Sequence, residues 1–158
     1  MNRLVGVISD THGLLRPEAQ VAMAGCEKIL HAGDVGDPEI LEELGAIAPT
    51  TAVRGNADRD PWAESLPGAA VVQVGDDLIV MVHDLDTLEF DPAALGCRVV
   101  ISGHSHRASV TWKGKVLYLN PGSAGPRRFG QPVSVAHLIF SDGQVQAEII
   151  PLDYEAEE

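Results

Sequence analysis

Short apolar runs of strand length recur in the first half of the chain, and segments with helical periodicity separate them. Continuous runs of this kind are typical of strands buried on both faces, and they cover residues 4–9, 28–34 and 50–56. Pro17 begins a first predicted helix over residues 17–27. Asp37, as N-cap, and Pro38 begin a second helix, which we expect to end at Gly45. This alternation predicts right-handed crossovers and a parallel sheet.

The second half shows strands joined by tight turns in place of the helical pattern. Residues 69–83 are predicted to form two strands around Gly75-Asp76-Asp77, and residues 98–104 another buried strand. Hairpin turns are predicted at Lys113-Gly114 and Asp142-Gly143. We find no internal repeat or low-complexity linker, so we predict one α/β domain over residues 1–158, with a frayed acidic tail from about residue 152.

Composition narrows the class of protein. With 158 residues, 45% hydrophobic and 22% charged, the chain can bury a proper core as a globular protein. Its formal net charge of −12 argues against a nucleic-acid polymer as partner, because such binding needs a basic face. The first apolar run is too short for a signal peptide or a membrane span. Cys26 and Cys97 lie in unrelated contexts, so we expect free thiols in a cytoplasmic protein without membrane contact.

Polar residues that can bind metal follow five of the predicted strands. They are Asp10 and His12, Asp34, Asn56 and Asp58, His83, and finally His104 and His106. In an open α/β sheet the carboxyl ends of the strands share one edge, where ligands bind. Oxygen and imidazole donors without a thiolate suit Mn²⁺, Fe or Zn²⁺. The set is too large for one tetrahedral ion, and it fits two ions that share a carboxylate.

Structural explanations exist for single members of this set: a helix cap for Asp10, a turn for Asp34, a left-handed turn position for Asn56 and a core position for His83. The whole set at one edge would require five coincidences. For His31 and His137, which lie inside predicted strands, we favour a structural role. His31 is also a candidate for orienting a metal ligand, because it precedes the Gly33-Asp34 turn.

The motifs "DTHG", "GDVGD", "GNAD", "GHSH" and "NPGS", in this order, resemble those of the calcineurin-like metallophosphoesterase superfamily. The similarity runs from residue 3 to about residue 150 and is greatest to the small single-domain phosphodiesterases of bacteria and archaea. It implies a four-layer αββα sandwich of two mixed sheets flanked by helices, with a dinuclear metal site at the strand ends. It also implies the ligands: Asp10, His12 and His106 for the first ion, Asp34 as the bridge, and Asn56, His83 and His104 for the second.

The function that this resemblance implies is hydrolysis of a small phosphodiester by a metal-bridged hydroxide. Mn²⁺ is the expected ion, with Fe, Zn²⁺ or Ni²⁺ as alternatives, and a homodimer is left open. The alternative function is a non-catalytic interaction scaffold, like the retromer subunit of this fold, although all seven ligand positions are filled here. A β-lactamase-type metallo-hydrolase is set aside, because Arg107-Ala108 follows His106 where its H-x-H-x-D-H cluster would continue.

The sequence departs from the superfamily pattern at one position next to the site. Larger members have a histidine after Gly-Asn, thought to protonate the leaving group, and here Ala57 occupies that position. We therefore expect a preference for aryl phosphodiesters, whose leaving group departs without an acid. Asp58 is the neighbouring candidate to take part, either directly or by orienting Asn56.

A second departure follows His83, where the small branch has Gly and often His and this chain has Asp84 and Leu85. Asp84 could tighten the second ion, crowd it or point to solvent. Arg127 and Arg128 are candidate phosphate contacts, given the suitability of Arg for phosphate. The loops 59–68 and 84–95 are expected to line the substrate pocket.

Overall fold

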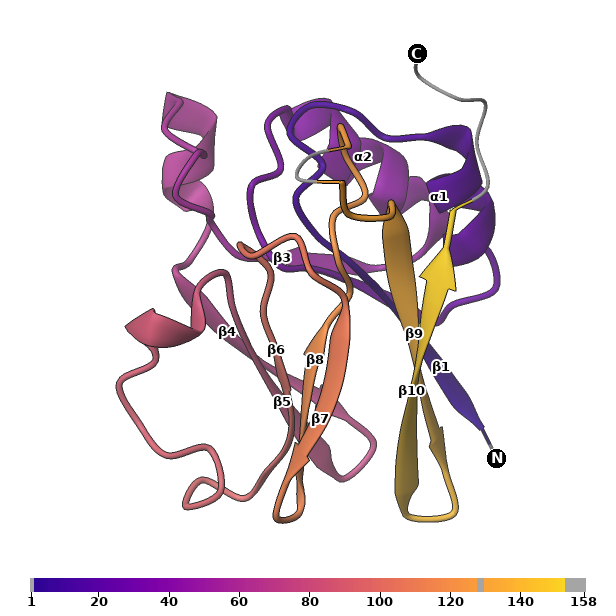
Figure 1. The fold of residues 1–158 in the computed structure, drawn as a ribbon, viewed down its shortest axis with the longest axis vertical. Coiled ribbons are helices and arrows are strands. Elements are labelled where there is room, and N and C mark those ends of the chain that lie inside the picture. The colour runs from indigo at the N-terminus through magenta and orange to yellow at the C-terminus, as the bar shows by residue number, and fades with distance from the viewer. Residues whose placement is uncertain (1, 128–129, 153–158) are drawn as a thin grey trace.

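The computed structural model describes residues 2–127 and 130–152. Two five-stranded sheets, each with parallel and antiparallel strands, face each other across one apolar core (Figure 1). Aliphatic side chains from both sheets fill this core, among them Val7 and Leu138 of the first sheet and Ile79 and Ile101 of the second. Full burial of such a side chain stabilises the fold by about 1.5–3 kcal/mol. The predicted sandwich of two mixed sheets is confirmed.

The first sheet has the strand order β10-β9-β1-β2-β3. Three of its strands are parallel, as the alternating pattern predicts: β1 (Arg3–Ile8), β2 (Lys28–His31) and β3 (Thr50–Ala52). The others form an antiparallel hairpin beside β1: β9 (Ser134–Ser141) and β10 (Gln144–Pro151). Asp142 and Gly143 form the predicted turn, and both have the positive φ that a tight two-residue hairpin turn requires.

The second sheet has the strand order β4-β5-β6-β8-β7. Its strands are β4 (Ala69–Val74), β5 (Asp77–Val82), β6 (Cys97–Ile101), β7 (Ser109–Lys113) and β8 (Val116–Asn120). Strands β5, β6 and β8 are parallel, and β4 and β7 flank them in the antiparallel direction. The hairpin turn between β7 and β8 is Gly114-Lys115. It lies one residue later than we predicted, because Lys113 still pairs with Val116.

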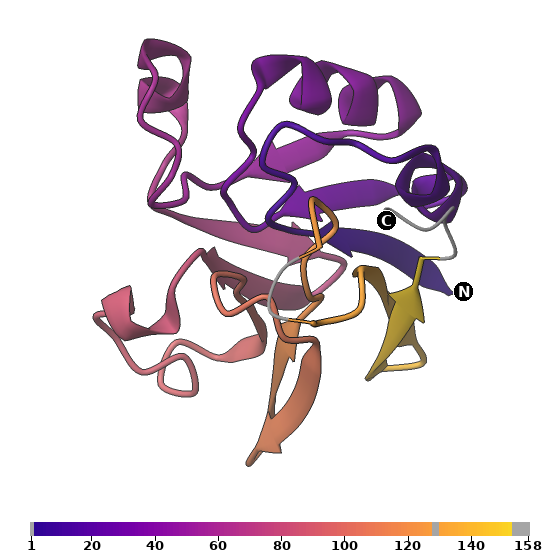
Figure 2. The same cartoon turned by 45° about the horizontal axis from the view of Figure 1, so that its top comes forward.

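Two α-helices cover the outer face of the first sheet: α1 (Pro17–Met23) and α2 (Pro38–Ile47) (Figure 2). Met23 and Leu44 pack with Ile8 and Ile29 of the sheet in a second apolar cluster. The predicted helix over residues 17–27 is too long, because Ala24 is already extended and Gly25 turns the chain with a φ of 87°.

The start of α2 is as predicted and its end is not. The Asp37 side chain accepts a hydrogen bond from the Glu39 N–H at 2.9 Å, so Asp37 is the N-cap. The helix continues through Gly45 and ends at Ile47. The reason is Pro49, which disfavours helical backbone at the residue before it, and Ala48 is accordingly extended.

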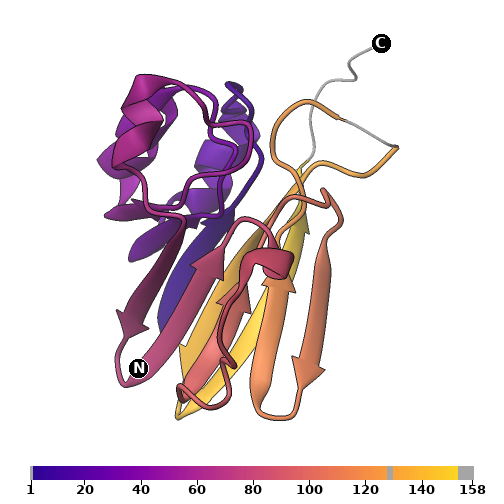
Figure 3. The same cartoon turned by 90° about the vertical axis from the view of Figure 1, so that its left-hand side faces the viewer.

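The outer face of the second sheet is covered differently. Within residues 2–127 and 130–152 it carries no α-helix, and only the 3₁₀ turn η2 (Leu85–Thr87) and the loop around it lie there (Figure 3). Leu88 from this loop packs with Val80, Cys97 and Val100 in a small third cluster. A further 3₁₀ turn, η1 (Pro61–Ser65), follows β3. The outer helical layer of the sandwich is therefore substantial on one side and reduced on the other.

We predict a frayed tail from about residue 152, which is the last described residue. Leu152 is buried in the apolar cluster beneath the two α-helices, and its N–H donates to the Val133 carbonyl at 2.9 Å. This apolar side chain is part of the packed structure. The remaining tail residues, 153–158, lie outside the described residues.

Candidate metal centre

All seven predicted ligands lie on loops that follow strands. These loops are at one end of the sandwich (Figure 1). Three loops follow β1, β2 and β3 of the first sheet, and two follow β5 and β6 of the second. Because both sheets direct parallel strands toward this end, five segments far apart in sequence deliver their polar residues to one place.

Two carboxylate oxygens lie at the centre of this group. Asp10 Oδ1 is 3.4 Å from His106 Nε2, 3.6 Å from His12 Nε2 and 3.9 Å from His83 Nε2. Asp34 Oδ2 is 3.2 Å from His83 Nε2 and 3.6 Å from His12 Nε2. Asp34 therefore lies between the two histidines that we assigned to different ions. Asp10, assigned to the first ion, also approaches His83.

The two histidines of "GHSH" have different neighbours. The His106 ring lies 5.4 Å from the His12 ring, whereas the His104 ring lies edge-on to His83 at 5.2 Å. His104 Nδ1 is also 3.2 Å from Asn56 Oδ1. These contacts divide the histidines into the same two groups as the predicted partition between ions.

The backbone of this site has an unusual conformation. Five of the seven predicted ligands have φ between 47° and 72°, namely Asp10, His12, Asp34, His104 and His106. Such left-handed conformations are costly for residues other than glycine, and they persist only where the surroundings enforce them. Hydrogen bonds between the loops do so here: Asp10 N–H donates to Gly33 O at 3.0 Å, and His12 N–H to Asp34 O at 2.9 Å.

Two glycines allow the loops to approach one another closely. A Cβ atom on Gly103 would overlap the side chains of Ser9 and Asp10, and one on Gly55 would overlap the Asp34 carboxylate. A larger residue at either position would separate the loops that carry the candidate ligands.

Each aspartate has one oxygen held by the protein and one directed into the cluster. Asp10 Oδ2 accepts from Ser9 Oγ at 2.7 Å and from the His104 N–H at 3.1 Å. Asp34 Oδ1 accepts from the Ala57 N–H at 2.8 Å. In the same way, His83 Nδ1 donates to the Ala32 carbonyl at 2.8 Å, which leaves its Nε2 to face the carboxylates.

Further residues hold the loops without facing the cluster. Asp58 is buried, and its carboxylate accepts from the N–H groups of Val35, Gly36 and Gly55 at 3.0 to 3.2 Å. It thus connects the loop of Asp34 to that of Asn56, which favours the orienting role over direct participation.

The buried side chain of His31 connects the loop of Thr11 to the loop of Gly33. Its Nδ1 accepts from the Gly33 N–H at 3.1 Å, so Nε2 carries the proton and donates to Thr11 Oγ1 at 3.0 Å. The Thr11 hydroxyl in turn donates to Val35 O at 2.8 Å. Burial lowers the pKa of His31 to about 4, so the ring is neutral at pH 7. His137 bonds the Ala22 carbonyl of α1 instead.

Asn120 braces the "GHSH" loop, a role that we did not predict from the sequence. Its Nδ2 donates to Gly103 O at 3.0 Å and to Ser105 Oγ at 3.1 Å, while its Oδ1 accepts from the Gly122 N–H. The signal was available, because Asn120 begins the "NPGS" motif.

The chemistry of the cluster fits divalent cations. Asp10 Oδ1, His12 Nε2 and His83 Nε2 are buried without a hydrogen-bond partner, which is costly unless another group compensates them. Burial opposes the charge of Asp10, yet contacts with His106 and His12 hold its pKa well below the usual range. Burial also opposes the charge of His83, but contact with Asp34 raises its pKa. The ionised Asp10 and the raised pKa of His83 both indicate that positive charge is favoured between these side chains.

One of the two predicted phosphate contacts lies among the described residues, and it is not part of this cluster. Arg127 is exposed in the loop between β8 and β9, and no described hydrogen bond or ion pair joins it to the candidate ligands. Arg128 lies outside the described residues. Asp84 is half-buried, and its Oδ2 is 3.8 Å from His104 Nε2.

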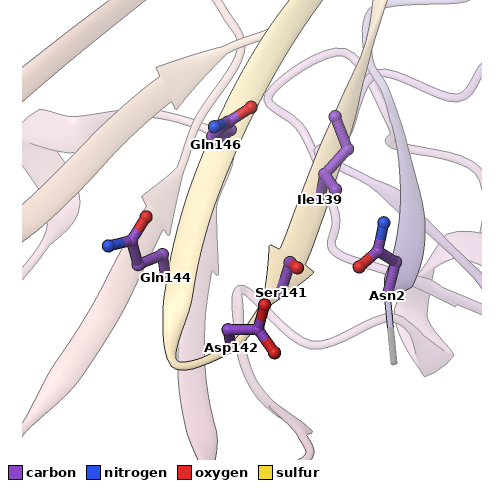
Figure 4. Close-up of a pocket in the computed structure, with 6 residues that line it drawn as sticks. All are labelled: Asn2, Ile139, Ser141, Asp142, Gln144 and Gln146. Atoms are coloured by element: carbon purple, nitrogen blue, oxygen red, sulfur yellow. The ribbon is translucent and has the colours of Figure 1, made fainter.

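A pocket of about 300 Å³ adjoins the cluster. His104 belongs to its wall, together with Asp84, Asp86, Ser105 and Tyr118. Another cavity, of about 370 Å³, lies at the β9–β10 hairpin among Asn2, Ile139, Ser141, Asp142, Gln144 and Gln146 (Figure 4). Since β9 is antiparallel to β1, this hairpin lies at the opposite end of the sheet from Asp10, and the cavity contains none of the predicted site residues.

The chain is similar to known metallophosphoesterases. A model of the calcineurin-like phosphoesterase superfamily domain matches residues 4–143. A probable metallophosphoesterase of Methanothermobacter thermautotrophicus is 37% identical over 159 residues, covering 93% of this chain and 91% of its relative. The chain therefore belongs to the calcineurin-like phosphoesterase superfamily, a metal-dependent family.

Solved structures show the same fold at lower identity. An archaeal phosphodiesterase superposes with a TM-score of 0.72 at 21% identity, covering 93% of this chain and 99% of the other. Vacuolar protein sorting 29 of Cryptosporidium parvum superposes with a TM-score of 0.74 at 24% identity, covering 97% and 99%. No helix in the described part of this chain is long and apolar enough to cross a membrane.

Proposed function

We propose that this protein is a metal-dependent phosphodiesterase that hydrolyses a small phosphodiester at the rim of the sandwich. The observation that carries the proposal is the convergence of five carboxylate and imidazole donors, Asp10, His12, Asp34, His83 and His106, with buried atoms that have no hydrogen-bond partner among them. Asn56 and His104 lie beside this group, His104 against His83 and Asn56 against His104. A structural cluster would be expected to satisfy these atoms internally, because an unpaired buried polar atom costs about 1–3 kcal/mol.

The proposed ligands keep the partition between two ions that the resemblance implies. Asp10, His12 and His106 would hold one ion, while Asn56, His83 and His104 would hold the other. Asp34 would serve both, because its Oδ2 lies between His12 and His83. This mixed donor set suits Mn²⁺ best, with Fe, Zn²⁺ or Ni²⁺ as alternatives. When bound, two such ions supply a water nucleophile near neutral pH and neutralise charge on the phosphate.

The adjoining pocket favours a diester over a monoester. Its wall carries the carboxylates of Asp84 and Asp86, and neither Lys nor Arg belongs to the part of the wall that the structure describes. A diester has one negative charge, whereas a monoester carries between one and two at neutral pH. The pocket would therefore repel a monoester more strongly and accept the uncharged alcohol group of a diester.

The structure offers no acid where larger relatives place a histidine. Ala57 occupies that position, and its N–H is already bonded to Asp34. We therefore expect substrates whose leaving group departs as a weakly basic anion, such as an aryl oxide. The free, buried thiols of Cys26 and Cys97 are typical of a reducing compartment, and we propose the cytoplasm as the place of action.

A non-catalytic scaffold is the alternative, and one observation favours it. Large apolar side chains lie exposed around the second sheet, among them Val71, Phe90, Leu95 and Trp112. Exposed apolar groups of this kind are found at protein interaction sites. The scaffold function predicts a folded protein without hydrolytic activity, so one experiment separates the two.

The test is hydrolysis of bis(p-nitrophenyl) phosphate by chelator-stripped protein, with and without added Mn²⁺. We expect turnover that requires the metal and exceeds turnover of the monoester p-nitrophenyl phosphate. The variant His104→Ala should lose about 100-fold or more of the rate. His137→Gln is the matched control, since His137 bonds α1 far from the rim, and it should retain the rate. Folded protein that is inactive with Mn²⁺, Zn²⁺, Ni²⁺ and Fe²⁺ would overturn the proposal.

A further inference from the structure

Asp84, the residue that departs from the pattern of the small branch, is held in a defined conformation. Its Oδ1 accepts from the Asp86 N–H at 3.0 Å, and its carbonyl accepts from Thr87 Oγ1 at 2.6 Å and Thr87 N–H at 3.0 Å. These bonds make Asp84 the cap of η2. They leave its other oxygen, Oδ2, directed toward His104 Nε2 at 3.8 Å.

The two nitrogens of the His104 ring have different neighbours. Nδ1 lies 3.2 Å from Asn56 Oδ1, which is the side of the proposed second ion. Nε2, on the other side of the ring, faces Asp84. The ring therefore stands between Asp84 and the ligand cluster, so the carboxylate can act on His104 without entering the cluster itself.

Comparison with His83 shows what Asp84 supplies. The Nδ1 of His83 is fixed by the Ala32 carbonyl, and its side chain is only 5% exposed. The His104 side chain is 48% exposed, and in the described structure its Nε2 has no such backbone partner. Among the described contacts, only Asn56 at Nδ1 and the edge of His83 restrain this exposed ring, and neither fixes Nε2. Metal-binding histidines generally donate their second N–H to a carboxylate or carbonyl, which fixes the tautomer and the ring orientation.

We propose that Asp84 is a positioning residue for His104: its carboxylate accepts the Nε2 proton and so holds Nδ1 toward the second ion. This inference rests on the proposed function and deepens it. The present 3.8 Å separation exceeds a hydrogen bond, and closing it to about 2.9 Å requires a ring shift of roughly 1 Å. The exposure of the His104 side chain permits such a shift. The negative charge of Asp84 also makes the lone pair of His104 Nδ1 a stronger metal ligand.

The experiment is calorimetric titration of chelator-stripped protein with Zn²⁺ and with Mn²⁺. In the wild type we expect two ions with distinguishable affinities. Asp84→Ala should weaken the second ion by about 10–100-fold and leave the first within about 3-fold. Asp84→Asn, which keeps the shape and an acceptor oxygen, should fall between the two. Glu89→Gln is the matched control, because it removes one charge from an exposed position of the same loop.

A second readout separates positioning from a general loss of charge. In the zinc-loaded wild type, the His104 Nε2 proton should give a resolved, slowly exchanging NMR signal, assigned by its disappearance in His104→Ala. That signal should broaden or vanish in Asp84→Ala and remain in Glu89→Gln. Circular dichroism verifies that each variant is folded.

The outcomes distinguish this inference from the proposed function. A wild type that binds no second ion would overturn both. A wild type that binds two ions, with unchanged second-ion affinity and an unchanged Nε2 signal in Asp84→Ala, would overturn the role of Asp84 alone. Equal weakening in Asp84→Ala and Glu89→Gln would also overturn it, because the effect would then be long-range charge.

Discussion

The donor cluster has a buried group, Asp10 and Asp34, and an exposed group, Asn56 and His104, and the fold holds the two with different firmness. Asp10 and Asp34 are buried, each with one oxygen tied to the protein, and their loops are joined by backbone hydrogen bonds. Asn56 and His104 are exposed; their side chains contact each other, and His104 also lies against the His83 ring and near Asp84. The first group is therefore preorganised by the fold. The second depends on side-chain contacts, which a single substitution can change.

The largest effect is expected at Asp34, the member of the buried group that would serve both ions. Asp34→Asn keeps the bond from the Ala57 N–H but places an amide where Oδ2 lies between His12 and His83. We expect both ions to bind more weakly and the hydrolytic rate to fall by about 100-fold or more. Equilibrium dialysis with metal analysis measures this, with His104→Ala as the comparison that should lose one ion. Loss of a single ion in Asp34→Asn would show that the carboxylate is not shared.

The free energy of unfolding should depend on pH through His31, the buried histidine that connects the loops of the buried group. His31 has a pKa of about 4 in the folded state, against an ordinary value near 6.5. As the pH falls through this range, the unfolded chain binds a proton that the folded chain does not, so stability is lost. The expected loss from this group is about 3 kcal/mol between pH 7 and pH 4.

Denaturant titrations of wild type and His31→Gln in the presence of chelator isolate this effect. His83, whose pKa is raised, acts in the opposite sense: its contribution is present below pH 6.5 and is lost as the pH rises. Only the difference between wild type and variant therefore reports His31. A difference that stays constant from pH 7 to pH 4 would contradict the buried neutral histidine.

Some features of the site could be predicted from the sequence and others could not. Polar residues directly after apolar runs predicted where Asp10, Asp34 and His83 lie, because strand ends are fixed by burial. The sequence did not indicate which carboxylate oxygen would face the cluster, or that Asn120 would brace the "GHSH" loop, since both depend on contacts between distant segments. The end of α2 was misplaced for a local reason, the effect of Pro49 on Ala48, which outweighed the Gly45 signal.

A smaller effect is expected in the relative affinity of the two ions. Preorganised ligands lose less conformational freedom on binding, so the ion held by Asp10, His12 and His106 should bind about 10-fold more tightly than the other. Stepwise titration of the loaded protein with a chelator, followed by metal analysis, measures the order of release. Simultaneous release of both ions would show that the buried and exposed groups behave as one unit.

The smallest effect is expected when a histidine, as a candidate general acid, replaces Ala57 beside the exposed group. Ala57 is exposed beside Asn56, and its N–H bond to Asp34 does not depend on its side chain. Ala57→His should therefore be tolerated and place an imidazole where larger relatives have one. General acid catalysis helps only a leaving group that needs a proton, and an acid whose position has not been refined should supply far less than its full potential, about 3-fold. The rate with an alkyl phosphodiester should rise by that amount while the rate with bis(p-nitrophenyl) phosphate stays the same. An equal rise for both substrates would indicate better metal binding or folding instead. The occupancy of the metal site, and not the lack of an acid, would then limit the rate.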